Sequence, residues 1–222
     1  MGKFTWKQLA DTQKLQELKI AGIDLVASDT KYSGFCILDG DEAVTMRLKS
    51  DEAMIAVITY ANVDLVSIDS PLGLPTGRKS CFDDDPGREK YGTFRECERI
   101  LRSRGINLFQ CLIPSMQKLT NRGIKLASKL RKAGFEVIES FPGGTQDILG
   151  IPRKQAGMDH LKQGLKNFGI RGDYLDSEIS HDELDAITCA ITGLFYKAGR
   201  YEAVGDPQEG QIIVPLPGAV QA

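Results

Sequence analysis

The sequence lacks the features that mark a membrane or exported protein. Among its 222 residues, no apolar run approaches the roughly 20 residues needed to cross a bilayer. The N-terminus is polar and lacks the apolar segment that a signal peptide requires. The five cysteines form no C-x-x-C pair, which argues against a zinc site, and their odd number favours reduced thiols. We therefore expect a cytoplasmic protein that does not enter a membrane.

An excess of charge of either sign is also absent. The 28 basic and 30 acidic side chains give a formal net charge of -2. Such a chain has no general attraction to nucleic acid, so any binding of that kind requires a local basic patch. No internal repeat or low-complexity segment is present, and the length and composition favour one globular domain.

Hydrophobic periodicity and turn residues predict an α/β domain at residues 20–200, with a mixed five-stranded sheet and helices on both faces. The first three strands form an antiparallel meander. An amphipathic appendage (1–19) precedes the domain, an extended tail (201–222) follows it, and an insertion or flap (71–114) separates the fourth strand from the next helix. The expected strands are 20–27, 33–38, 42–48, 63–68 and 135–138, and the expected helices are 51–61, 93–104, 115–133, 155–168 and one from 181.

The start of the last helix holds two carboxylates at the edge of a buried surface. Ser180 followed by Glu183 forms a capping box, which predicts that the helix begins at His181 and that Glu183 folds back on the backbone. Asp182 and Asp185 remain, three residues apart on one face. Acids in this position either stabilise the helix start or belong to a functional site.

Acidic residues also mark three predicted strands. Asp24 interrupts the first strand, Asp69 follows the fourth and Glu139 follows the fifth. Because open α/β sheets place their sites at strand ends, we expect these acids to meet Asp182 and Asp185 there. Crowded carboxylates repel one another and are stabilised by a cation. Oxygen ligands favour Mg²⁺ or Mn²⁺, and two such ions can promote phosphodiester hydrolysis without a protein nucleophile.

These positions carry a family resemblance. With Gly22-Ile23-Asp24 on the first strand, the element order is similar to that of the ribonuclease H-like (retroviral integrase) fold. The segments Ile68-Asp69-Ser70-Pro71, Glu139-Ser140-Phe141-Pro142-Gly143 and His181-Asp182-Glu183-Leu184-Asp185-Ala186 resemble the DUF429 family, predicted nucleases of that fold. The resemblance implies metal-binding carboxylates at Asp24, Asp69, Asp182 and Asp185. It also implies a catalytic carboxylate cluster that includes Glu139 and acts on DNA or RNA.

Two arginines and a histidine are among the candidates for contact with phosphate. Arg95 and Arg99, four apart on one helix face, either steady a phosphate or pair with neighbouring acids such as Glu98. His181 at the helix start either moves a proton or contacts phosphate, or is an exposed residue without a role.

A basic stripe follows the helix predicted at 115–133. Its members recur at a 4-3-4-3 spacing without an acidic partner on the helix: Lys118, Arg122, Lys125, Lys129 and Lys132. The stripe is either a solvated face or a phosphate-binding surface. We count Lys118, Arg122 and Lys125 among the candidate substrate-binding residues.

Two further classes of function stay open. The loop Asp24 to Thr30 loosely resembles the phosphate-binding hairpin of actin-like sugar kinases, so the chain would be an ATP-handling half-site completed by dimerisation. Alternatively, the acids serve a non-catalytic metal-binding or nucleic-acid-binding protein. The sequence does not distinguish DNA from RNA, and it leaves the oligomeric state open.

Overall fold

The computed structural model describes residues 4–9, 13–176 and 178–218, in which one eight-stranded sheet has the order β6-β3-β2-β1-β4-β5-β8-β7. The strands are β1 (Lys19–Asp24), β2 (Ser33–Asp39), β3 (Glu42–Leu48), β4 (Leu65–Asp69), β5 (Val137–Ser140), β6 (Arg171–Gly172), β7 (Tyr201–Val204) and β8 (Ile212–Pro215). The helices are α1 (Trp6–Leu9), α2 (Asp51–Ala61), α3 (Arg88–Tyr91), α4 (Glu96–Ser103), α5 (Gln117–Lys132), α6 (Pro142–Leu149), α7 (Met158–Phe168) and α8 (His181–Lys197), with 3-10 turns at Gln13–Glu17, Lys154–Ala156 and Asp173–Leu175.

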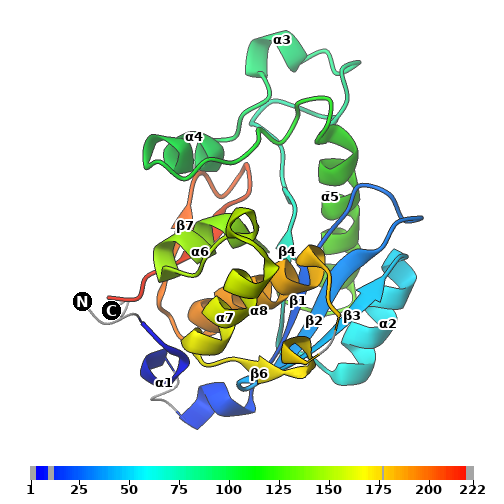
Figure 1. Ribbon diagram of the computed structural model, residues 1–222. Coiled ribbons are helices and arrows are strands. Elements are labelled where there is room, and N and C mark those ends of the chain that lie inside the picture. The colour runs from blue at the N-terminus through cyan, green and yellow to red at the C-terminus, as the bar shows by residue number, and fades with distance from the viewer. Residues whose placement is uncertain (1–3, 10–12, 177, 219–222) are drawn as a thin grey trace.

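The sheet separates two hydrophobic cores, and β1 shows how its residues divide between them. Ile20 packs in the core that contains α7 and α8, while Ala21 and Ile23 pack in the core formed with α2 and α5. Period-two alternation along the strand produces this division. Helices therefore cover both faces, as expected (Figure 1). None of the helices in the described ranges is long and apolar enough to cross a membrane.

The α/β class is confirmed, but the sheet is larger than the five strands expected from the sequence. The short strand β6 pairs with β3, and β8 joins the opposite side through β5, with β7 beyond it. Strands β7 and β8 come from the segment expected as an extended tail. The run Ile212 to Val214 is buried in the sheet, which explains why this segment pairs with β5.

Local signals explain several boundaries. Ser50 caps α2 by accepting the N–H of Ala53 at 3.2 Å, and Asn62 ends it in the left-handed conformation, with φ 51°. The insertion 71–114 carries α3 and α4 and extends beyond the end of the sheet (Figure 1). Cys97 and Leu101 of α4 pack against residues of β7 and β8, so this part of the insertion is anchored to the sheet.

Two glycines allow α8 to lie directly on the sheet. A methyl group at Gly34 of β2 would lie 1.9 Å from the carbonyl oxygen of Asp182, and one at Gly22 of β1 would lie 2.0 Å from that of Ala186. The obstructing atoms are helix backbone, which cannot turn aside as the end of a flexible side chain can. Any side chain at these glycines would push the start of α8 away from the strands.

Replacement of Gly34 by alanine is therefore expected to lower the free energy of unfolding by about 3 kcal/mol, which is the upper end of the usual cost of overpacking a core. Urea denaturation measures this change. Gly218→Ala is the control, because a methyl group there meets nothing within 4 Å. It should change stability by less than about 0.5 kcal/mol. A Gly34→Ala variant as stable as the wild type would contradict this packing of α8.

Candidate active site

Asp24 and Asp69 lie side by side at the ends of adjacent parallel strands. They are register partners in β1 and β4, whose backbones are roughly 4.8 Å apart. Ile20 and Leu65, four residues earlier on each strand, pack in the core with α8, so alternation places both aspartates on the α8 face. Ser140 continues this row on β5, where it is the register partner of Asp69.

The first turn of α8 brings two more carboxylates over this row. The carbonyl of Asp182 lies against Gly34, which is the register partner of Asp24. The helix begins here because Ser180 Oγ accepts the N–H of Glu183 at 3.3 Å while the Glu183 carboxylate accepts the N–H of Ser180 at 2.9 Å. The expected capping box is thus confirmed. Asp185 follows three residues later on α8 and is buried, with 6% of its surface exposed.

Burial and the crowding of the aspartates raise the pKa values of Asp24, Asp69 and Asp185. Burial, followed by the negative charges of Asp69, Asp185 and Asp182, raises the pKa of Asp24 well above its usual range. Burial, followed by the charge of Asp185, raises the pKa of Asp69 to about 8. Burial also raises the pKa of Asp185. The four side chains therefore share one site, in which negative charge is unfavourable unless protons or a cation compensate it.

Two polar side chains reach Asp185 from the segment between β5 and α7. Gln146 of α6 donates a hydrogen bond to Oδ1 at 2.8 Å, and the Lys154 ammonium lies 3.5 Å from Oδ2. Burial alone would lower the pKa of Lys154, but the charges of Asp185 and Asp24 outweigh it and raise that pKa. Lys154 thus partly neutralises the aspartates.

The donor set fits a divalent cation in its chemistry. The four aspartates offer only carboxylate oxygens, which Mg²⁺ and Mn²⁺ prefer, and positive charge relieves their repulsion. In the described ranges, no group of three or more His, Cys, Asp or Glu side chains has the geometry to hold a metal ion as it stands. Both oxygens of Asp185 contact Gln146 or Lys154. Ion binding at Asp185 therefore requires these contacts to rearrange.

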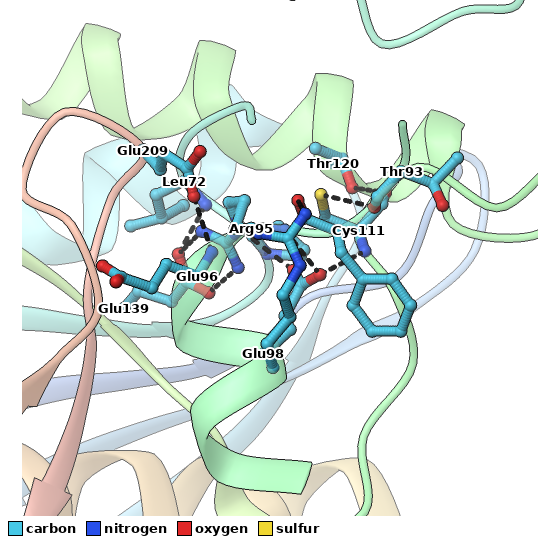
Figure 2. A network of polar contacts seen from close by, with 12 residues as sticks. Leu72, Thr93, Arg95, Glu96, Glu98, Cys111, Thr120, Glu139 and Glu209 are labelled. Carbon is cyan, nitrogen blue, oxygen red and sulfur yellow. Dashed lines mark hydrogen bonds and ion pairs between the residues drawn. The ribbon is translucent and has the colours of Figure 1, made fainter. Parts of the chain in front are cut away.

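Glu139 lies on the opposite face of the sheet from the aspartates, although it lines the same cleft as Asp69 and Asp185 and its charge helps to raise the pKa of Asp69. It shares its face of β5 with Val137, which packs in the core with α2 and α5. Its carboxylate accepts hydrogen bonds from Arg95 at 2.8 and 2.6 Å and from the N–H of Leu72 at 2.7 Å (Figure 2). With both oxygens engaged, Glu139 is better placed to anchor the insertion than to serve as the additional catalytic acid expected from the sequence.

Arg95 is held within the same buried network. It is 1% exposed and also donates to the Glu98 carboxylate at 2.9 Å, so that it lies between Glu98 and Glu139 (Figure 2). Of the two interpretations of Arg95, the structure therefore supports pairing with neighbouring acids over contact with phosphate. Arg99 is exposed, with its guanidinium 5.9 Å from the ring centre of Phe94.

The basic stripe of α5 is partly paired with acids of α2. Arg122 is buried and donates to Asp51 at 2.9 Å, and Lys129 lies 3.6 Å from the same carboxylate. Lys118 and Lys125 line a separate hollow of 460 Å³. Because α5 packs on the sheet face opposite α8, this hollow is not part of the aspartate site. The sequence did not predict these ion pairs between α5 and α2, because the acids belong to another helix.

A cleft of 610 Å³ opens beside Asp69 and Asp185. His181 is exposed and does not line this cleft. Lining residues that the sequence did not indicate include Phe109, Ser140, Gln146, Arg153 and Lys154. Alternation from Ile138 would have placed Ser140 on the aspartate face. The others belong to the insertion or to the connection after β5, where no periodic pattern indicated an orientation.

Comparison of the chain with protein-family models, with curated proteins and with solved structures gave no match.

Proposed function

We propose that this protein is a divalent-cation-dependent nuclease with a ribonuclease H-like fold, acting at the aspartate site. One observation carries the proposal: Asp24 and Asp69 are register partners on adjacent strands, and together with Asp185 of α8 they form a site that disfavours negative charge. The elements from β1 to β4 follow the order βββαβ. That order and the resemblance to the DUF429 family support the fold assignment.

The aspartates of the sheet and those of α8 would have different roles in cation binding. Asp24 would be shared between two cation positions, Asp69 and Asp185 would complete them, and Asp182 would support Asp185 or alternate with it. Mg²⁺ or Mn²⁺ bound here would activate water and neutralise charge on the phosphodiester oxygens. Lys154, beside the cleft, would attract the anionic strand and balance the remaining acidic charge.

Cleavage of nucleic acids in the presence of Mn²⁺ tests this proposal. The substrates are single-stranded DNA and RNA, duplexes, hybrids and branched junctions, each incubated with the wild type or Asp24→Asn. We expect the wild type to cut at least one substrate and the variant to lose 100-fold or more of that rate, roughly the loss when one group that stabilises transition-state charge is removed. Equal cutting by both proteins would contradict the site. Mn²⁺ binding without any cutting would favour the non-catalytic alternative.

A further inference from the structure

The start of α6 presents unpaired backbone donors beside the aspartates. The helix begins two residues after Ser140, the register partner of Asp69. Its N-cap residue, Phe141, makes no capping hydrogen bond with its side chain, and the first turn contains no acid. Within the described ranges, the N–H groups of Gly143 and Gly144 make no hydrogen bond. Such a helix start attracts anions through its N–H groups and its dipole.

The side chain of Arg153 packs against the start of α6 at Gly143. A methyl group at Gly143 would lie 3.0 Å from both Cζ and Nη1 of Arg153, so only glycine leaves the guanidinium this close to the helix backbone. Arg153 donates from Nε and Nη2 to Asp147. Nη1 makes no hydrogen bond among the described residues and stays available to a ligand. The pairing with Asp147 also fixes the orientation of the guanidinium plane.

A buried hydroxyl gives a second and independent indication of a ligand. Ser140 lines the cleft and is 2% exposed, yet its Oγ has no hydrogen-bond partner in the described part of the chain. The Cys189 thiol lies beside it and offers no more than a weak hydrogen bond. Buried hydroxyls in native proteins almost always have a partner. A ligand oxygen in the cleft would supply it.

We propose that the start of α6, with Arg153 and Ser140, is a phosphate subsite of the cleft. The donors are the backbone N–H of Gly143, the Nη1 of Arg153 and the hydroxyl of Ser140. They line the same 610 Å³ cleft as Asp69 and Asp185. The subsite is positive, whereas the aspartates would repel an anion until a cation arrives. The two regions therefore suit different phosphates of one ligand.

The substrate class follows from this arrangement and rests on the proposed nuclease activity. A nucleic-acid strand carries a phosphate on every nucleotide, so a strand whose scissile phosphate lies at the aspartates can place a neighbouring phosphate at α6. A volume within the roughly 300–1,000 Å³ typical of small-molecule sites admits one or two nucleotides and not a duplex. The subsite therefore selects a single strand or an unpaired end.

Binding of a fluorescent single-stranded oligonucleotide, followed by anisotropy in EDTA, tests the subsite without any cation. We expect Arg153→Gln to weaken binding roughly tenfold, as for loss of a charged hydrogen bond. Gly143→Asp should weaken it at least as much, because its carboxylate would take the place of the phosphate. An acid in the first turn also stabilises a helix, so this variant should remain folded.

Arg171→Gln is the matched control, since Arg171 is an exposed arginine that also pairs with an aspartate, Asp41, at the far edge of the sheet. It should change affinity less than twofold. Oligonucleotides that carry one neutral methylphosphonate linkage add a second test. At one position of the strand, the neutral linkage should weaken binding to the wild type but not to Arg153→Gln. The subsite is refuted if Arg153→Gln and Gly143→Asp bind like the wild type, or if Arg171→Gln weakens binding equally. Cleavage is not measured, so nuclease failure would be a separate result.

Discussion

Replacement of Arg95 by methionine should lower the free energy of unfolding by about 3–5 kcal/mol, the usual cost of leaving buried charges without their partner. Arg95 is 1% exposed and donates to both Glu139 and Glu98. Methionine fills a similar volume without the charge, so two carboxylates would remain buried in a region from which water is excluded. Chemical denaturation followed by circular dichroism measures the loss.

The control for this variant is an exposed arginine in a comparable pair. Arg104 contacts Glu202 at 2.7 Å, with side chains 44% and 36% exposed. Arg104→Met should cost about 0–1 kcal/mol, because solvent screens the pair. If Arg95→Met and Arg104→Met destabilised the protein equally, the buried network would not be what fixes the insertion to β5.

Asp69→Asn is expected to make the cation-free protein more stable than the wild type at pH 8, with a smaller difference near pH 4. The pKa of Asp69 is about 8 in the folded protein, against about 3.9 in an unfolded chain. Between these values the folded state holds a proton that the unfolded state has released. Wild-type stability therefore falls as pH rises through this window, by at most about 1.4 kcal/mol per pH unit.

That slope is an upper bound, because Asp69 is partly exposed and its ionisation is linked to that of Asp24 through their charges. The measurement is the unfolding free energy of both proteins in EDTA from pH 4 to pH 9. Asp84→Asn, an exposed substitution in the insertion, should follow the wild type at every pH. A constant difference between Asp69→Asn and the wild type across this range would show that the aspartates do not crowd one another.

The sequence predicted the elements whose pattern is local. Hydrophobic periodicity and turn residues predicted β2, β3 and α2, and the capping signal of Ser180 predicted the start of α8. Helix α6 was missed because Pro142-Gly143-Gly144 indicates a break, although proline is favoured in the first position of a helix. Strands β7 and β8 were missed because their pairing depends on contacts distant in sequence.

The candidate site was predictable to the extent that it depends on strand ends and one helix start. Asp24, Asp69 and Asp185 follow from those two features. Glu139 lines the cleft beside Asp69, but because β5 ends at Ser140 and not at residue 138 as expected, alternation turns it to the other face of the sheet, where it pairs with Arg95. Lys154 belongs to a 3-10 turn whose position is set by the packing of α6 and α7 against α8. No local pattern specifies such packing.

The most direct test of the aspartate site is titration of the purified protein with Mn²⁺, monitored by calorimetry and by the loss of the free-ion electron paramagnetic resonance signal. We expect the wild type to bind Mn²⁺, and Asp24→Asn to bind at least tenfold more weakly, because it removes a ligand shared by the cation positions. Asp84→Asn should bind like the wild type. Equal Mn²⁺ affinity in the wild type and Asp24→Asn, or no binding by either, would contradict a cation site at these aspartates.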